Sequence, residues 1–513
     1  MVKPVDSRLP AVFNPLRTSK TIVVALAAAA IALLLVRVIK SLRGRVKPLT
    51  AEELRVQGCD DFNNQKFDQA IRKFTLALRY NLSESKQSVL YNNRALAYIE
   101  KSDSDAALAD FERALECHPT PHLLLRIYFY RGNLFACQKK DYKAAIADFT
   151  QALELPCTHQ NMHVEIFIER ARAYRNNNEP DAALADFERA LKYHTTPDLL
   201  LRIYFYRGSV FADKKGSYET AIADFDKALG FPSSDQDFRV KILIERARAH
   251  SSLGRYEQTL ADLNAAFALN SQNRILRAKI LAFRAQANIY LKRTATILND
   301  LNEALQCSDP QLRFFIYVLR GDYYLETEYD AMALHDYTQA IGCKSLDEET
   351  FAEVVYKRGM AHANLKHGDE ALKDFTQALQ SSVSNDHLKA QILNRRAMVY
   401  AEREEYQLAV DDLTQAIDLQ PEYAQPPSWY LRASVYLNWE RFPESIQDFT
   451  TALALGSNDK AFQAETLYLR GKVYWANHQP DLARVDFETA LSYNPTKNGL
   501  RETLVAELAN LKN

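Results

Sequence analysis

Small and apolar residues recur three and four positions apart along most of the chain, which predicts a succession of amphipathic α-helices. One predicted helix of each unit has the pattern A-(I/L)-x-D-F-x-x-A-L, and the stretch ALADFERAL occurs at residues 107–115 and again at 183–191. The helix before it carries an aromatic residue, an arginine, a small residue and a second aromatic, as in Tyr128, Arg131, Gly132 and Phe135. Each unit is therefore predicted to be a helix, a turn and a second helix.

The aspartate of this pattern returns at a nearly fixed interval, which indicates a repeat array. The steps are 38 residues, with two of 36, and they place it at Asp110, Asp148, Asp186, Asp224, Asp262, Asp300, Asp336, Asp374, Asp412, Asp448 and Asp486. An earlier unit at residues 67–78 has Lys73 in this position, so we count twelve repeats, the first of them atypical. Such a period is typical of solenoids, in which stacked neighbours bury the faces that one repeat cannot bury alone.

The exact repetition of ALADFERAL has an evolutionary explanation that needs no catalytic role. Residues 105–156 and 181–232 align without gaps, and 36 of the 52 positions are identical. The offset is 76 residues, or two repeats, so we interpret it as the recent duplication of a two-repeat block.

An arginine stands directly before the small residue of the first helix in every repeat after the first, and the aspartate follows 16 or 17 residues later. So many identical pairs cannot all be active sites. We interpret them as structural ion pairs that join two helices of one repeat or of neighbouring repeats. Examples are Arg94 with Asp110, Arg170 with Asp186, Arg207 with Asp224 and Arg246 with Asp262.

The N-terminal region differs from the rest. Residues 21–39 form an apolar, alanine-rich segment, preceded by two basic residues and followed by five within residues 37–47. We predict a short tail (1–20), a single-pass transmembrane helix (21–39) and a basic linker (40–50), with the repeats facing the cytosol because the more positive flank is C-terminal. A cleaved targeting peptide and a buried helix are the alternative interpretations.

Composition and motifs favour a binding protein over an enzyme. The net charge is −1, so no overall basic field points to nucleic acid. The chain lacks phosphate-binding glycine loops, the H-E-x-x-H zinc motif and the G-x-S-x-G nucleophile elbow. Two loops contain zinc-type ligands, but the duplicated copy keeps only one of them, so we expect no metal and no cofactor; these ligands are Cys117, His118, His122, Cys157, His159 and His163.

The repeats resemble the tetratricopeptide repeat family, whose consensus is matched in order by Ala171, Tyr174, Ala183, Phe187 and Ala190. The resemblance covers residues 51–495 and implies an all-α, right-handed superhelical solenoid of about twelve helix hairpins with a concave groove for a polypeptide. The family period is about 34 residues, and we expect the four extra residues here to lengthen the first helix by about one turn. Residues 496–513, with leucines at helical spacing, are predicted to form a capping helix.

The layout of an N-terminal anchor before a tetratricopeptide array resembles the large chaperone-docking receptors of the mitochondrial outer-membrane translocase. The resemblance implies that the groove accepts preproteins, that cytosolic heat-shock chaperones and translocase subunits are partners, and that the chain lies in the mitochondrial outer membrane. The alternative is a membrane-tethered scaffold or co-chaperone adaptor on the endoplasmic reticulum or a bacterial inner membrane.

That resemblance also implies a clamp for the acidic chaperone tails, formed by five polar residues in the first three repeats. Arg55 matches the first of them, Cys59 replaces an asparagine, and Asn93 matches the third. The third repeat aligns in two ways. Either Arg126 stands in the lysine position or Arg131 stands in the arginine position.

Overall fold

The computed structural model describes residues 49–156, 160–343, 347–381, 384–419, 426–456, 459–495 and 499–511. The predicted tail and transmembrane helix, and nearly all of the basic linker, lie outside these ranges. Every regular element in the described ranges is helical, which agrees with the predicted all-α class. None of the helices in these ranges combines the length and the apolar character needed to cross a membrane.

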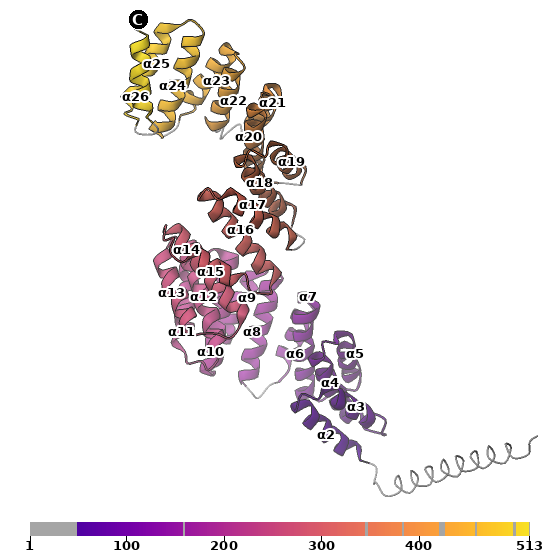
Figure 1. The fold of residues 1–513 in the computed structure, drawn as a ribbon. Helices are drawn as coiled ribbons and strands as arrows, with labels where there is room; N and C mark the ends of the chain where they lie inside the picture. The colour runs from indigo at the N-terminus through magenta and orange to yellow at the C-terminus, as the bar shows by residue number, and fades with distance from the viewer. Residues whose placement is uncertain are drawn as a thin grey trace, which may run out of the picture. The chain divides into compact units, whose positions relative to one another are not determined.

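The chain divides into two compact units, residues 1–210 and 211–513. In the first, successive hairpins lie side by side (Figure 1) and consist of α2 (Ala51–Asn63), α3 (Phe67–Ala77), α4 (Glu84–Glu100), α5 (Ser104–Glu116), α6 (Pro121–Leu134), the π-helical turn η1 (Phe135–Lys139), α7 (Tyr142–Glu154), α8 (Gln160–Asn176) and α9 (Pro180–Ala190). The unit boundary falls within α10 (Pro197–Lys215).

The second unit continues the alternation of a first and a second helix, called helix A and helix B below. It consists of α11 (Tyr218–Gly230), α12 (Gln236–Ser252), α13 (Tyr256–Ala268), α14 (Arg274–Tyr290), α15 (Ile297–Ala304), α16 (Pro310–Glu326), α17 (Asp330–Gly342), α18 (Glu348–Asn364), α19 (Gly368–Gln380), α20 (Asp386–Glu402), α21 (Tyr406–Asp418), α22 (Pro426–Asn438), α23 (Phe442–Ala454), α24 (Lys460–Ala476), α25 (Pro480–Ser492) and α26 (Leu500–Asn510).

The lengths of the two helices account for the 38-residue period. The A helix α12 has 17 residues and the B helix α13 has 13. A turn of three residues separates them, and five residues connect α13 to α14. The A helices α4, α8, α14, α16, α18, α20 and α24 also have 17 residues, so helix A is the long helix of these repeats, as we expected from the period.

The turn between helix A and helix B is similar in all twelve repeats, because one of its residues has a positive φ. In ten repeats the next N–H returns to a carbonyl five residues back, as from Lys66 to Asp61, which closes helix A with a Schellman motif. In the third and fifth repeats it returns six residues back, from Asp141 to Phe135 and from Ser217 to Phe211. Only two of these residues with a positive φ are glycines. The twelve residues are Gln65, Ser102, Lys140, Asn178, Gly216, Gly254, Lys292, Glu328, Lys366, Glu404, Glu440 and His478.

The core lies within and between the hairpins. In the third repeat the fully buried ring of Phe149 packs so closely on helix A that a Cβ added to Gly132 would lie 2.8 Å from it. The same cluster includes Ile166 of the next repeat, so each hairpin completes the core of its neighbour. At the C-terminal end, α26 buries Leu504 against the last hairpin.

Candidate functional site

The A helices form the inner face of each unit. Most of them contact the next A helix, as α2 contacts α4 and α20 contacts α22, whereas no contact of this extent joins consecutive B helices in the described ranges. Stacked layers that are closer together on one side curve toward that side, so the A helices line the concave surface of each unit. A polypeptide-binding site is therefore expected on these helices.

The predicted clamp residues of the first two repeats lie together on this face, but their polar groups already contact other side chains of this chain. Arg55 donates to the carboxylate of Glu52 on its own helix, with nitrogen–oxygen distances of 2.5 to 3.2 Å. The amide of Asn93 lies 3.6 Å from the sulfur of Cys59. Burial raises the pKa of the Cys59 thiol, so it stays neutral and contributes no charge to a ligand.

The two arginines of the third repeat have different partners. Arg131 forms two hydrogen bonds to Asp148, at 2.8 and 2.7 Å, and so belongs to the structural arginine–aspartate series. Arg126 lies over the ring of Tyr130 at 5.9 Å and has no carboxylate partner among the described residues. Arg126 and Arg131 therefore differ in that only Arg131 is held by an ion pair.

The arginine–aspartate pairs are bidentate and join helix A to helix B within one repeat. Arg94 and Asp110 meet at 2.7 Å through both of their bonds, and Arg170 and Asp186 meet at 2.7 and 2.8 Å. The same geometry recurs at Arg246 with Asp262, Arg284 with Asp300, Arg320 with Asp336, Arg358 with Asp374, Arg396 with Asp412, Arg432 with Asp448 and Arg470 with Asp486.

Arg207 and Asp224 occupy the equivalent positions of the fifth repeat. Asp224 is buried, and the guanidinium of Arg207 lies 5.4 Å from the ring centroid of Tyr204.

Several of these arginines form a third hydrogen bond, from the guanidinium to the preceding repeat. The sequence did not predict this bond. Nη1 of Arg94 donates to Thr75 at 2.9 Å, and Nη1 of Arg396 donates to Thr376 at 3.1 Å. The acceptor lies on the previous helix B, two residues after the aspartate position, and it is also an asparagine or an aspartate in some repeats. The series therefore joins helices within a repeat and also joins neighbouring repeats.

The first repeat has a different ion pair, because Gln57 stands in its arginine position. Lys73, in the aspartate position of helix B, lies 2.6 Å from Asp61, which is on helix A. The atypical lysine thus keeps an ion pair between the two helices of its hairpin.

The zinc-type loop residues do not converge in the described part of the chain. No group of three or more potential ligands is close enough there to hold a metal ion. Cys117 lies 3.9 Å from the amide oxygen of Gln87, and His118 lies 3.4 Å from Glu84. Cys157 and His159 fall outside the described residues.

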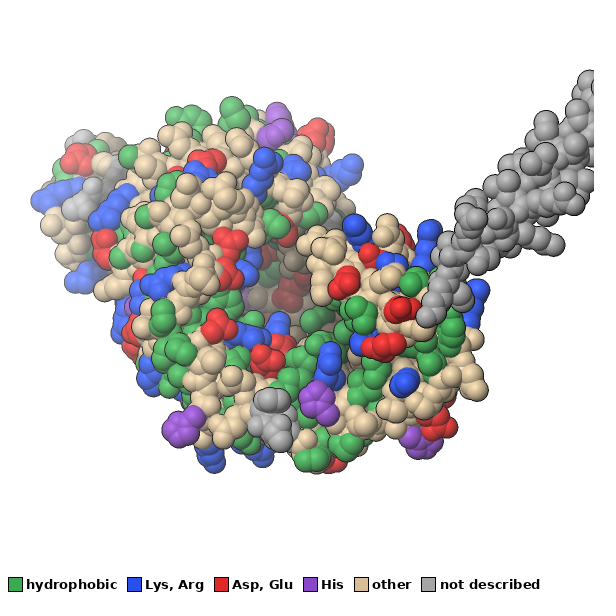
Figure 2. Space-filling model, turned by 90° about the horizontal axis from the view of Figure 1, so that it is seen from below, with side chains coloured by type: hydrophobic (Ala, Val, Ile, Leu, Met, Phe, Trp, Pro, Cys, Tyr) green, Lys and Arg blue, Asp and Glu red, His purple; other side chains and the backbone are tan. Residues whose placement is uncertain are grey.

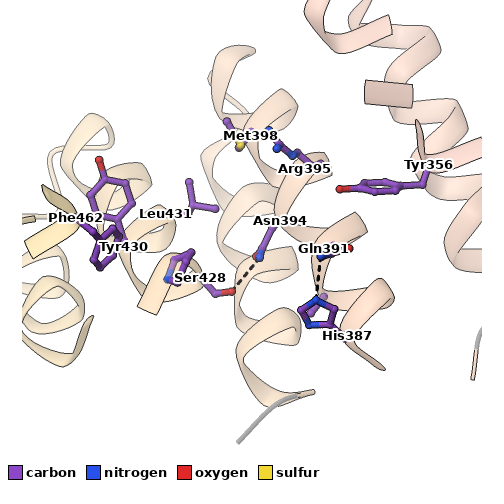
Figure 3. A pocket seen from close by; sticks show the side chains of 12 residues that line it. Tyr356, His387, Gln391, Asn394, Arg395, Met398, Ser428, Tyr430, Leu431 and Phe462 are labelled. Carbon is purple, nitrogen blue, oxygen red and sulfur yellow. Dashed lines mark hydrogen bonds between the residues drawn. The ribbon is translucent and has the colours of Figure 1, made fainter. Parts of the chain in front are cut away.

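A groove of about 470 Å³ opens on the inner face of the second unit, between α18, α20, α22 and α24 (Figure 3). Its apolar walls come from four different helices, through Tyr356, Met398, Leu431 and Phe462. Most of its polar groups come from α20, where Gln391, Asn394 and Arg395 follow one another along the helix, and Ser428 of α22 adds a hydroxyl. These residue types do not recur from repeat to repeat, so the periodicity could not single them out.

Acidic and basic side chains are interspersed on the molecular face shown in Figure 2, without a large patch of one sign. This distribution agrees with the net charge of −1 and directs attention to local features such as the groove.

The fold and the open inner face define a helical-repeat solenoid of the protein-interaction class. Two sets of matches, both to the family described as tetratricopeptide repeat, cover residues 55–121, 92–156, 168–237 and 356–425, and residues 464–497. Together they span more than half of the chain, which therefore belongs to the tetratricopeptide repeat family.

Comparison with solved structures gives distant similarities. The chain is similar to one in the crystal structure of the APC/C hetero-tetramer Cut9–Hcn1, at 13% identity and a TM-score of 0.38, over 91% of this chain and 97% of that one. It is also similar to the tetratricopeptide domain of P58(IPK), at 16% identity and a TM-score of 0.32, over 76% of this chain and 98% of the other. No curated protein sequence matches the chain.

Proposed function

We propose that this chain is a membrane-tethered receptor that holds segments of other polypeptides against its A helices. Tetratricopeptide arrays are protein-interaction scaffolds, and the observation that carries the proposal is the groove between α18 and α24. The repeats around it complete their own cores, yet apolar side chains of four helices remain open to a ligand. Apolar walls with a few convergent polar groups are the usual composition of a binding site.

The membrane attachment is proposed from residues 21–39 and their basic flanks. We place the chain in the mitochondrial outer membrane with the repeats in the cytosol, where it would accept preproteins and pass them to translocase subunits. The test is to image the full chain with a fluorescent protein at its C-terminus. Labelling of the mitochondrial surface that is lost on deletion of residues 21–39 supports the proposal, and a reticular pattern contradicts the choice of membrane.

Docking of chaperone tails is proposed at Arg55, Asn93 and Arg126, because these keep side chains on the inner face of the first unit. A fluorescent peptide with the acidic C-terminal tail of the heat-shock chaperones should bind saturably to the purified chain. Arg126→Ala should weaken binding at least tenfold, and Arg131→Ala should instead lower stability. Absence of saturable binding would refute chaperone docking without affecting the groove of the second unit.

A specific observation favours the scaffold alternative for the first unit. Arg131 is fully engaged by Asp148, and Cys59 replaces a hydrogen-bonding amide, so fewer donors face a carboxylate than in the receptors that the layout resembles. If the tail peptide does not bind, we favour a membrane-tethered scaffold that assembles a protein complex without chaperones.

A further inference from the structure

One cation in the second-unit groove lacks an ionic partner. Arg395 is exposed on α20 and forms no ion pair with any described residue, although it lies among the groove residues shown in Figure 3. Lys357, at the equivalent position of the preceding repeat, lies 2.9 Å from Asp322 and 3.1 Å from Glu353. The protein therefore neutralises one of these two inner-face cations and leaves the other for a ligand.

A polar acceptor lies one residue away. The amide nitrogen of Asn394 donates to the hydroxyl of Ser428 at 3.0 Å, which fixes the orientation of the side chain. The amide oxygen is buried and has no donor among the described residues. A buried acceptor without a partner is costly, so this amide keeps one unfilled hydrogen bond beside the groove.

The apolar walls are distributed on both sides of these polar groups. Tyr356 approaches from α18, and Leu431 and Phe462 from α22 and α24 (Figure 3). The far end of the groove is less suitable for an anion, because the hydroxyl of Tyr430 donates to the carboxylate of Glu465 at 3.0 Å. The charge distribution thus gives the groove a direction, with its positive end at α20 and a carboxylate beyond α22.

From these contacts we infer that the groove between α18 and α24 binds an extended polypeptide segment in which a carboxylate side chain is flanked by apolar residues. The carboxylate pairs with Arg395, and the apolar residues contact Leu431 and Phe462. This inference rests on the proposed polypeptide-binding function, and it specifies the ligand chemistry at one part of the inner face.

The test uses the full-length protein and three fluorescent nine-residue peptides, identical in their Leu and Phe residues and carrying Asp, Asn or Lys at the centre. Fluorescence anisotropy should show saturable binding of the Asp peptide, about tenfold weaker binding of the Asn peptide, and weaker binding still of the Lys peptide. Arg395→Glu should reverse the order of the Asp and Lys peptides. Leu431→Ala should weaken all three by a similar factor.

Two controls make the outcomes distinct. Lys373→Glu makes the same change of charge on the exposed surface of α19 and should leave all three affinities unchanged. Arg126→Ala alters the first unit only and should also have no effect. Saturable binding that is insensitive to Arg395→Glu would overturn the inference and leave the receptor function standing. Failure of every peptide to bind would overturn both.

Discussion

The arginine–aspartate series should be a main source of stability, and Asp412 allows this to be measured. Its carboxylate receives hydrogen bonds from Nε and Nη2 of Arg396, both at 2.7 Å, and its side chain is only 5% exposed. The hydrogen bond to Asp412 raises the pKa of Arg396. The arginine also stays charged when the carboxylate is removed, because a guanidinium is too basic to lose its proton in a protein. Asp412→Ala therefore leaves a guanidinium with two unpaired N–H groups in a site where it is 17% exposed.

Removing one partner of a fully buried ion pair costs about 3–5 kcal/mol. Some water reaches Arg396, so we expect Asp412→Ala to reduce the free energy of unfolding by about 2–3 kcal/mol. Asp411→Ala is a closely matched control, because Asp411 is the preceding residue of the same helix and is exposed. It should change stability by less than about 0.5 kcal/mol.

Urea unfolding followed by circular dichroism measures the effect, and hydrogen exchange of α20 to α22 localises it, because repeat arrays can unfold in parts. Replacing the arginine as well, in Arg396→Met with Asp412→Ala, removes the unpaired charge and should restore at least about 1 kcal/mol. Thr376→Val should cost about 1 kcal/mol by removing only the bond to the preceding repeat. Equal losses from Asp412→Ala and Asp411→Ala would refute this account of the series.

Three further predictions concern thermal melting. Gly132→Ala places a methyl group 2.8 Å from a buried ring and should cost about 1–3 kcal/mol, whereas Gly342→Ala, which meets no atom within 4 Å, should be neutral or stabilising by about 0.5 kcal/mol. Gly254→Ala should cost about 1 kcal/mol of stability, because the backbone φ at this residue is +71°. Glu404→Gly, at a residue with a φ of 63°, should raise the melting temperature. A stabilising Gly254→Ala together with a destabilising Glu404→Gly would contradict this account of the turns. Burial lowers the pKa of His250, so the folded protein binds this proton less readily than the unfolded chain, and stability should fall as the pH drops through about 6.5; an unchanged acid response in His250→Gln would exclude this histidine as a cause.

The sequence predicted those features of the fold that every repeat shares. The recurrence of Asp110 and its equivalents, with an arginine 16 or 17 residues earlier, was sufficient to place both helices and to identify the arginine and aspartate as an ion pair. The pattern could not decide whether the arginine acts within a repeat or between repeats, because the acceptor in the preceding repeat changes from Thr75 to Asp226 to Asn264. A position that varies in residue type but keeps one function is visible only in three dimensions.

The turns and the clamp were harder to predict for different physical reasons. Ten of the twelve left-handed turn residues are not glycines, so the usual sequence signal for a helix end is missing, and the Schellman hydrogen bonds hold these residues in place. In the clamp, Arg126 and Arg131 are five residues apart on the same helix, so the sequence left open which of them stands in a clamp position. The spacing did place Arg131 in the arginine–aspartate series, and its hydrogen bonds to Asp148 agree with that.

The division between repeated and varying positions also explains how one fold can be specific for its ligands. The residue directly before each arginine of the arginine–aspartate series occupies the same place on successive A helices. In the second unit Arg395 and Leu431 stand at this position, and both line the groove. Along that unit it changes from Glu245 through apolar residues to Lys357 and Arg395, and then to apolar residues again. The arginines of the series form ion pairs with the aspartates and hold the two helices of each hairpin together. The residues directly before these arginines can therefore vary without loss of stability. The affinity for a polypeptide should therefore depend on the order of charged and apolar residues in that polypeptide. Reversing the order of these residues in the bound segment should weaken binding more than changing the net charge of the segment.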